Sequence, residues 1–153
     1  MLTNKIDRMG SSDAAVWRLA VETIIAADDR ENKLLTTTES ADALADTRCY
    51  AFLASTGGAP IGLLTAYRFP DLESGGSLVY LYDIEVLSTH RKHGVGRALL
   101  ECLIESCEHD QVKLIWAGTE AENTAARAAF EATDAELEGE SYVEYEWDLE
   151  DDE

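Results

Sequence analysis

The chain has 153 residues and a formal net charge of -19, with 12 Lys and Arg against 31 Asp and Glu. This length supports one domain with a sizeable core, so we expect a single domain over 1–149 and an acidic tail over 150–153. A pI near 4.3 argues against nucleic acid as a partner, because most of the surface would repel phosphates. The acid excess fits either a cationic ligand or adaptation to salt.

The sequence contains no signal-peptide pattern and no apolar run of membrane-spanning length, so we expect a cytoplasmic protein without a membrane partner. Cys49, Cys102 and Cys107 are odd in number and lack metal-ligand spacing, which favours reduced, buried thiols. His90 and His93 lie in a predicted loop without further thiol or acidic ligands nearby. We therefore expect no metal site.

The first half of the chain predicts two helices followed by an antiparallel hairpin. Ser11 or Ser12 is expected to cap the first helix, whose predicted apolar residues are Ala14, Val16, Leu19, Ala20, Ile24 and Ile25. The acidic, glycine-containing loop at 71–76 either lines a substrate mouth or is only solvated. The predicted elements, in chain order, are a strand over 4–9, helices over 13–27 and 38–45, and strands over 48–55 and 61–69.

The central strand is predicted over 78–86. Without a bulge, alternation places Asp83 and Glu85 on one face with Val79 and Leu81, and the other face then carries Tyr80, Tyr82, Ile84 and Val86. Asp83 is an acid within an apolar run. Because an unpaired buried carboxylate is costly, Asp83 needs a partner, water or a chemical role.

The stretch His90–Arg97 reverses the sign of the chain, since it carries three of the 12 Lys and Arg, two of the three His and no acid. A helix is predicted to follow from about residue 94 to 109, and its start leaves backbone N–H groups unpartnered. Gly94 and Gly96 let an anion approach the backbone, so the turn predicts a phosphate site. The third glycine of the dinucleotide fingerprint is missing.

Three further elements are predicted after this helix. They are a strand over 111–117, an alanine-rich helix over 121–132 and a last strand over 139–149.

The pattern Arg91-x-x-Gly94-x-Gly96, preceded by Ile84-x-Val86, resembles the acetyl-CoA-binding motif of the GNAT-type N-acetyltransferases. The strand Tyr80-x-Tyr82-Asp83, followed by the turn 90–94, looks more specifically like the aminoglycoside 3-N-acetyltransferases of type I. The likeness covers roughly 48–149 and is tightest over 80–96. It implies an α+β fold with a mixed, largely antiparallel sheet, splayed beside the central strand and covered by helices on both faces.

The resemblance also implies the reaction and its participants. An aminoglycoside antibiotic, a small polycation, would accept an acetyl group from acetyl-CoA at its 3-N position, without a metal or covalent intermediate. Asp83 is the implied base, and the backbone N–H of Ile84 or Val86 is a candidate oxyanion donor. The oligomeric state stays open, a homodimer included.

The residues that the resemblance assigns fall into two groups. The cofactor-binding group is Ile84, Glu85, Val86, Arg91, Lys92, His93, Gly94, Val95, Gly96, Arg97, Ala98, Asn123, Ala126 and Phe130. The substrate-binding group is Tyr80, Tyr82, Asp83, Glu120, Glu146 and Asp148.

Two positions depart from the family pattern. Phe130 stands where a Tyr often protonates the leaving thiolate, and Asp134 stands where a Gly usually ends the helix. A phenyl ring donates no proton, so either water or another group is the acid, or the thiolate leaves unassisted. Two other functions therefore stay open, namely acetylation of another amine (a polyamine, an amino acid or a basic peptide) and a non-catalytic acyl-CoA-binding regulatory module.

Overall fold

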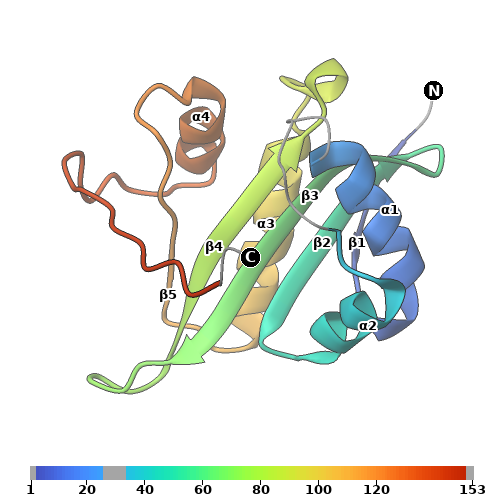
Figure 1. The fold of residues 1–153 in the computed structure, drawn as a ribbon. Helices are drawn as coiled ribbons and strands as arrows, with labels where there is room; N and C mark the ends of the chain where they lie inside the picture. Colours follow the sequence, from blue (N-terminus) through green and yellow to red (C-terminus); the bar gives the residue numbers. More distant parts are fainter. Residues whose placement is uncertain (1–2, 26–33, 151–153) are drawn as a thin grey trace.

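The computed structural model describes residues 3–25 and 34–150 and has a five-stranded sheet with helices on both faces (Figure 1). Neighbouring strands are antiparallel from β1 to β4, and β5 runs parallel to β4. This confirms the expected mixed, largely antiparallel fold. The strands are β1 (Asn4–Arg8), β2 (Cys49–Thr56), β3 (Ala59–Pro70), β4 (Ser77–Val86) and β5 (Leu114–Trp116). The helices are α1 (Ala14–Ile25), α2 (Thr37–Ala45), α3 (Val95–His109) and α4 (Thr124–Ala132), with 3-10 turns η1 (Ser11–Asp13) and η3 (Ser88–His90).

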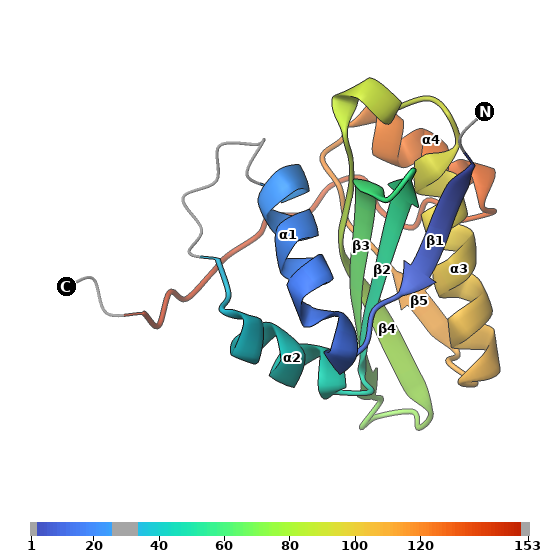
Figure 2. The same cartoon turned by 90° about the vertical axis from the view of Figure 1, so that its right-hand side faces the viewer.

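Two hydrophobic cores lie on opposite faces of the sheet (Figure 2). On the α3 face, Leu99 and Leu103 pack with Leu64 of β3. On the α1 face, Trp17 packs with Leu63, the residue that precedes Leu64 in β3. Successive strand residues point to opposite faces, so the continuous apolar run in β3 supplies both cores.

The second helix begins at Thr37, one residue before its predicted start, whereas the predicted cap of the first helix is not observed. In α2, the Thr36 hydroxyl accepts from the Glu39 N–H at 3.1 Å, and the Glu39 carboxylate accepts from the Thr36 N–H at 3.2 Å. The serine cap predicted for the first helix is wrong, because Ser11 and Ser12 lie within η1. The Asp13 carboxylate accepts from the preceding Gly10 N–H instead, at 2.8 Å.

The predicted apolar face of α1 is also wrong in part. Val16 and Leu19 are 54% and 57% exposed, whereas Trp17 is buried at 7%. The last residues of the predicted helix, 26–27, lie outside the described residues.

The alternation predicted for β4 fails after Leu81, because a β-bulge shifts the register. Leu81 lies opposite Ala66, whereas Asp83 lies opposite the adjacent residue Thr65. Tyr82 is therefore the extra residue of β4, and the strand beyond it changes its facing.

This change of facing moves Asp83 to the α1 face of the sheet. Directly opposite residues of an antiparallel pair share a face. Ile84 lies opposite Leu64 of the α3-face core, and Glu85 lies opposite Leu63 of the α1-face core. Asp83 and Glu85 thus point away from α3, contrary to the prediction that grouped them with the apolar residues of β4.

The strand predicted over 139–149 is wrong, because the structure has no strand there and every residue of the segment is exposed. Tyr145 and Trp147 are 79% and 83% exposed. The alternating pattern suits a strand, but a strand also needs a partner edge. In the described chain, β5 is only three residues long, shorter than the predicted strand over 111–117.

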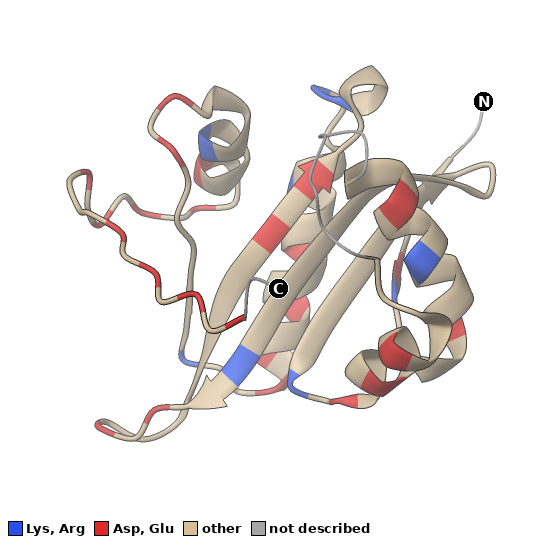
Figure 3. Ribbon diagram, in the orientation of Figure 1, with Lys and Arg blue, Asp and Glu red and all other residues tan. Residues whose placement is uncertain are grey.

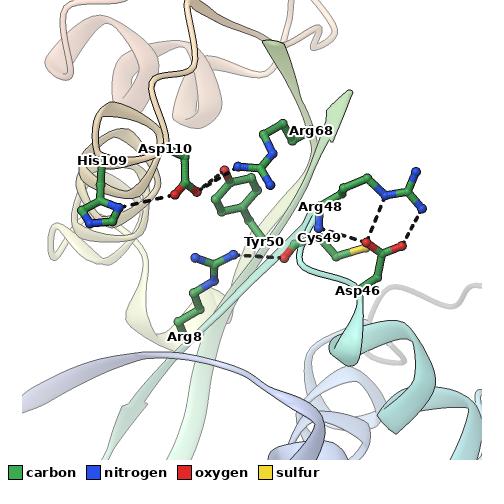
Figure 4. A network of polar contacts seen from close by, with 8 residues as sticks. All are labelled: Arg8, Asp46, Arg48, Cys49, Tyr50, Arg68, His109 and Asp110. Carbon is green, nitrogen blue, oxygen red and sulfur yellow. Dashed lines mark hydrogen bonds and ion pairs between the residues drawn. The ribbon is translucent and has the colours of Figure 1, made fainter. Parts of the chain in front are cut away.

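A polar network joins one end of the sheet to the end of α3 (Figure 4). The buried Tyr50 hydroxyl donates to the Asp110 carboxylate at 2.6 Å, and an Arg68 nitrogen lies 3.4 Å from the same oxygen. The guanidinium of Arg8 stacks over the Tyr50 ring, 4.5 Å from its centroid. Burial raises the pKa of Tyr50, and the hydrogen bond from Tyr50 lowers the pKa of Asp110.

We predict that Tyr50→Phe lowers the free energy of unfolding by about 1–3 kcal/mol near pH 7, because a charged acceptor loses its buried donor. Because the folded state lowers the pKa of Asp110, its ionised carboxylate stabilises the fold fully at pH values above the unfolded pKa of 3.8. This stabilisation is lost as the pH falls from 3.8 through the lower pKa of the folded state. The difference from wild type should therefore shrink in acid. Denaturant unfolding at several pH values measures it, and an equal loss at neutral and acidic pH would contradict the assignment.

Candidate functional site

The candidate site begins where β4 and β5 separate. β5 pairs with β4 only along Leu78–Tyr80, while β4 continues to Val86. Beyond the pairing, a cleft of about 110 Å³ opens between β4, the segment 117–119 and α4. The edge of a strand that lacks a neighbour offers backbone N–H and C=O groups to a ligand.

This cleft brings together site residues that are distant in the sequence. Asp83 and Ile84 line it from β4, and Asn123, Ala126 and Phe130 line it from the start and inner side of α4. A larger cavity of about 450 Å³ lies between β1 and α1, and none of the predicted site residues lines it. The smaller cleft is therefore the one that matches the predicted chemistry.

The basic turn leads directly into an uncapped helix N-terminus. Gly94 is the N-cap of α3, has a φ of 82° and makes no side-chain capping bond. The first helical hydrogen bond runs from the Ala98 N–H to the Gly94 carbonyl at 3.0 Å, so the amides of 95–97 precede it. Together with the exposed Arg91 and Lys92, these amides make a site suited to an anion.

Two arginines of the turn already have intramolecular partners. The Arg91 Nε donates to the Val86 carbonyl at 3.0 Å, which ties the turn to the end of β4. The Arg97 Nε donates to the Glu101 carboxylate at 2.9 Å, in an exposed i,i+4 pair. A Cβ added at Gly96 would lie 3.9 Å from the Val86 side chain, so the turn and the strand end are neighbours.

The two ends of α4 show what Asn123 and Asp134 do in the fold. The Asn123 side chain caps α4 by accepting from the Ala126 N–H at 3.1 Å, which gives it a structural role beside any ligand contact. Asp134 follows the helix with a φ of 66°, the left-handed conformation in which glycine is usual and which Asp tolerates better than most residues.

The structure brings some predicted substrate residues together. Tyr80 and Tyr82 have ring centroids 6.5 Å apart, next to Asp83. Glu120 lies in the loop beside the cleft, where its carbonyl accepts from the Asn123 N–H at 3.0 Å.

Glu146 and Asp148 are not brought to the site by any contact of the described residues. Asp148 accepts locally from the Glu150 N–H at 3.0 Å. The beginning of their segment approaches the cleft wall, where the Tyr142 hydroxyl would lie 3.0 Å from a Cβ at Gly118. Figure 3 shows the acids of this segment running as a series away from α4.

The acidic loop between β3 and β4 uses its first acid for structure. Lys113 lies 2.8 Å from the Asp71 carboxylate, which also accepts from the amides of Glu73 and Ser74. These donors, Lys113 first, lower the pKa of Asp71 to about 2. Asp71 therefore has a structural role, which neither of the two interpretations of this loop included.

Sequence reasoning missed three aromatic residues on the same face as Asp83. Tyr67 and Phe69 extend from β3, and Trp116 extends from β5. All three are exposed. For Tyr67 and Phe69 the signal was an aromatic residue at alternate positions in the predicted strand over 61–69.

The described residues offer little support for metal or thiol chemistry. Residues 3–25 and 34–150 contain no group of three or more His, Cys, Asp or Glu placed to hold a metal ion. Burial raises the pKa of Cys49, Cys102 and Cys107, in the last case to about 11, which keeps these thiols protonated near neutral pH. Within the same ranges, none of the helices has the length and apolar character to cross a bilayer.

Comparison with known proteins identifies one protein family. A model of the acetyltransferase (GNAT) family matches residues 14–134. No curated protein matches the chain in sequence.

Solved structures share the fold. The aminoglycoside acetyltransferase meta-AAC0020 from an uncultured soil metagenomic sample, in complex with trehalose, has a TM-score of 0.85 at 19% identity, over 96% of this chain and 97% of that chain. The aminoglycoside N-acetyltransferase AAC(6')-Iy in complex with CoA has a TM-score of 0.74 at 21% identity, over 96% of each chain. The ribosomal-protein-alanine N-acetyltransferase from Brucella melitensis biovar Abortus 2308 has a TM-score of 0.71 at 20% identity, over 95% of this chain and 100% of that one.

We predict that Gly94→Ala weakens binding of coenzyme A at least about tenfold, equivalent to about 1.4 kcal/mol, because the methyl group enters the space in front of the uncapped amides. Gly58→Ala is the matched control, since Gly58 has a φ of 83° and, like Gly94, open space around its Cβ position. Both variants should lose similar stability, about 1–2 kcal/mol. Calorimetric titration with coenzyme A separates them, and equal affinities would refute an anion site at this turn.

Proposed function

We propose that this chain, which belongs to the acetyltransferase (GNAT) family, transfers the acetyl group of acetyl-CoA to the 3-N amino group of an aminoglycoside. The observation that carries the proposal is the cleft between β4 and α4, which contains Asp83 and begins where the pairing of β4 with β5 ends. The basic turn follows directly at the end of the same strand.

The residues present fit acetyl-CoA as the donor substrate. The uncapped amides at 95–97 suit its pyrophosphate, and Arg91 and Lys92 add positive charge beside them. The edge of β4 at 84–86, beyond its pairing with β5, suits the amide groups of the pantetheine arm, with Phe130 on the opposite wall. When bound, acetyl-CoA supplies an activated acetyl thioester.

In the proposed reaction, Asp83 removes the proton of the acceptor amine. An alkyl amine with a pKa around 10 is protonated near neutral pH, and deprotonation costs about 4 kcal/mol. Asp83 takes the proton directly or through one water. Neighbouring ammonium groups of a polycationic acceptor lower the pKa of the reacting amine and reduce this cost.

Two other steps are assigned to backbone and solvent. A backbone N–H of Ile84 or Val86 polarises the carbonyl under attack, as an oxyanion donor. Phe130 lines the cleft but has no proton to donate. The leaving thiolate is therefore protonated by water or another group, or departs unprotonated, which a thiol pKa near 8.5 permits.

Charge and the structural neighbours support an aminoglycoside as acceptor. The chain carries a net charge of -19, and Asp83 and Glu85 stand at the cleft. A second structure of meta-AAC0020 is in complex with sisomicin, at a TM-score of 0.84 and 18% identity. Acids near a bound polycation would favour it over neutral amines.

A basic peptide is the second candidate acceptor, since an acidic face attracts it as well and one structural neighbour is a ribosomal-protein-alanine N-acetyltransferase. Thiol release from acetyl-CoA, measured with sisomicin, spermidine, lysine and a basic peptide, distinguishes these acceptors. Binding of coenzyme A without turnover of any amine would instead favour the non-catalytic module.

We predict that Asp83→Asn lowers kcat with sisomicin by about 100-fold or more, because the isosteric amide keeps the shape and loses the base. The KM for acetyl-CoA should change little. Asp42→Asn is the same substitution at an exposed residue of α2, and it should leave kcat unaltered. Steady-state thiol release measures all three proteins, and a fully active Asp83→Asn enzyme would exclude Asp83 as the base.

A further inference from the structure

Five aromatic rings form a continuous row across three strands on the α1 face. Tyr67 lies 5.7 Å from Tyr82, and Tyr82 lies 6.5 Å from Tyr80, all between ring centroids. Tyr80 lies 5.2 Å from Trp116, which in turn lies 5.4 Å from Phe69. We call Tyr67, Tyr82, Tyr80, Trp116 and Phe69 the aromatic row.

The packing of the fold does not account for this row. None of its members belongs to either hydrophobic core. Phe69, Trp116 and Tyr67 are 38%, 40% and 42% exposed, and Tyr82 is 65% exposed. A contiguous exposed patch of large apolar side chains usually marks a binding surface.

One end of the row lies at the proposed base. Tyr82 directly precedes Asp83, and Tyr67 is close enough that the Asp83 charge contributes, after burial, to raising the pKa of Tyr67. The other end lies where β4 pairs with β5, since Trp116 is the register partner of Tyr80. Phe69 lies four residues along β3 from Thr65, the register partner of Asp83, so the row reaches about 13 Å from the proposed base along the strand. An acceptor held at Asp83 would therefore extend along the row only if it has more than one ring.

We infer that the aromatic row is an extended acceptor subsite, which binds the rings of a multi-ring aminosugar that lie beyond the ring being acetylated. This inference rests on the proposed function and identifies the residues that set its preference for acceptor size. Tyr80 and Tyr82 were implied by the family resemblance. Tyr67 adds a third ring near Asp83, and Phe69 and Trp116 extend the subsite away from it.

The chemistry of the row fits this ligand. Aromatic faces attract ammonium groups, and they also cover the apolar C–H faces of sugar rings. A linear polyamine offers ammonium groups and a thin methylene chain, but no ring face to cover an aromatic ring. The acidic charge at the Asp83 end and the net charge of -19 disfavour phosphate-bearing ligands, including nucleotides, on this face.

The test compares Trp116→Leu and Phe69→Leu with wild type, using sisomicin and the single-ring acceptor 2-deoxystreptamine. We expect the KM for sisomicin to rise about 5- to 30-fold in each variant. The kcat, the KM for acetyl-CoA and the kcat/KM for 2-deoxystreptamine should each stay within about twofold of wild type. A merely structural role would lower kcat or affect both acceptors alike.

Leu19→Ala is the control for loss of an exposed apolar side chain, since Leu19 is 57% exposed and lines the cavity at β1. It should leave all these constants unchanged, and thermal unfolding checks that each variant is folded. An unchanged KM for sisomicin in both Trp116→Leu and Phe69→Leu overturns the inference.

Calorimetric titration with sisomicin separates this inference from the proposed function. Binding without acetylation by the wild type would overturn the function, and weaker binding by Trp116→Leu would then still support the row. Acetylation that Trp116→Leu and Phe69→Leu retain in full would support the function and overturn the row. Wild-type protein that neither binds nor acetylates sisomicin would overturn both.

Discussion

The short pairing between β4 and β5 is the constraint on which the site depends. A parallel partner that continued beside β4 to Val86 would bond its backbone and close the cleft. The pairing ends after Tyr80, and the chain departs through 117–123 to α4. Backbone groups in a partly enclosed cleft need partners. In the proposed function, this position takes the pantetheine arm, an extended ligand that can form hydrogen bonds as a strand does.

The entry to β5 is held by contacts that fix this divergence. The Lys113 N–H donates to the Ser77 carbonyl at 3.1 Å, and the Lys113 side chain binds Asp71. At the other side of the cleft, Asn123 caps α4 and orients the wall that contains Phe130. The beginning of β5 and the beginning of α4 are thus held by polar contacts, so the walls of the cleft do not depend on side-chain packing alone.

The acid excess of the chain is not uniformly available to a ligand. Asp46, Asp71 and Asp110 each accept hydrogen bonds from neighbouring donors, which lower the pKa of each carboxyl. Exposed charges more than about 8 Å from a ligand are largely screened in physiological salt. In the proposed function, selection of a cationic acceptor therefore depends on the acids at the cleft, Asp83 and Glu85, rather than on the total net charge.

Local patterns predicted most of the fold, because helices and hairpins depend on neighbours in sequence. The helix expected over 38–45 and the hairpin between the strands expected over 48–55 and 61–69 are examples. Features that depend on a distant partner were not predictable. The bulge at Tyr82 is defined by register against β3, and the segment 139–149 has strand periodicity without a strand to pair with.

The bulge at Tyr82 also explains how one strand could serve two substrates. Regular alternation would have directed Asp83 into the α3-face core, beside Leu81 and away from every tyrosine of the row. One additional residue moves Asp83 to the α1 face, while Ile84 returns to the core and the strand edge still runs toward the basic turn. In the proposed reaction, the donor therefore approaches β4 along its edge and the acceptor approaches over its face. The two approaches meet at Asp83, a geometry that suits direct transfer between two simultaneously bound substrates and requires no covalent relay through the protein.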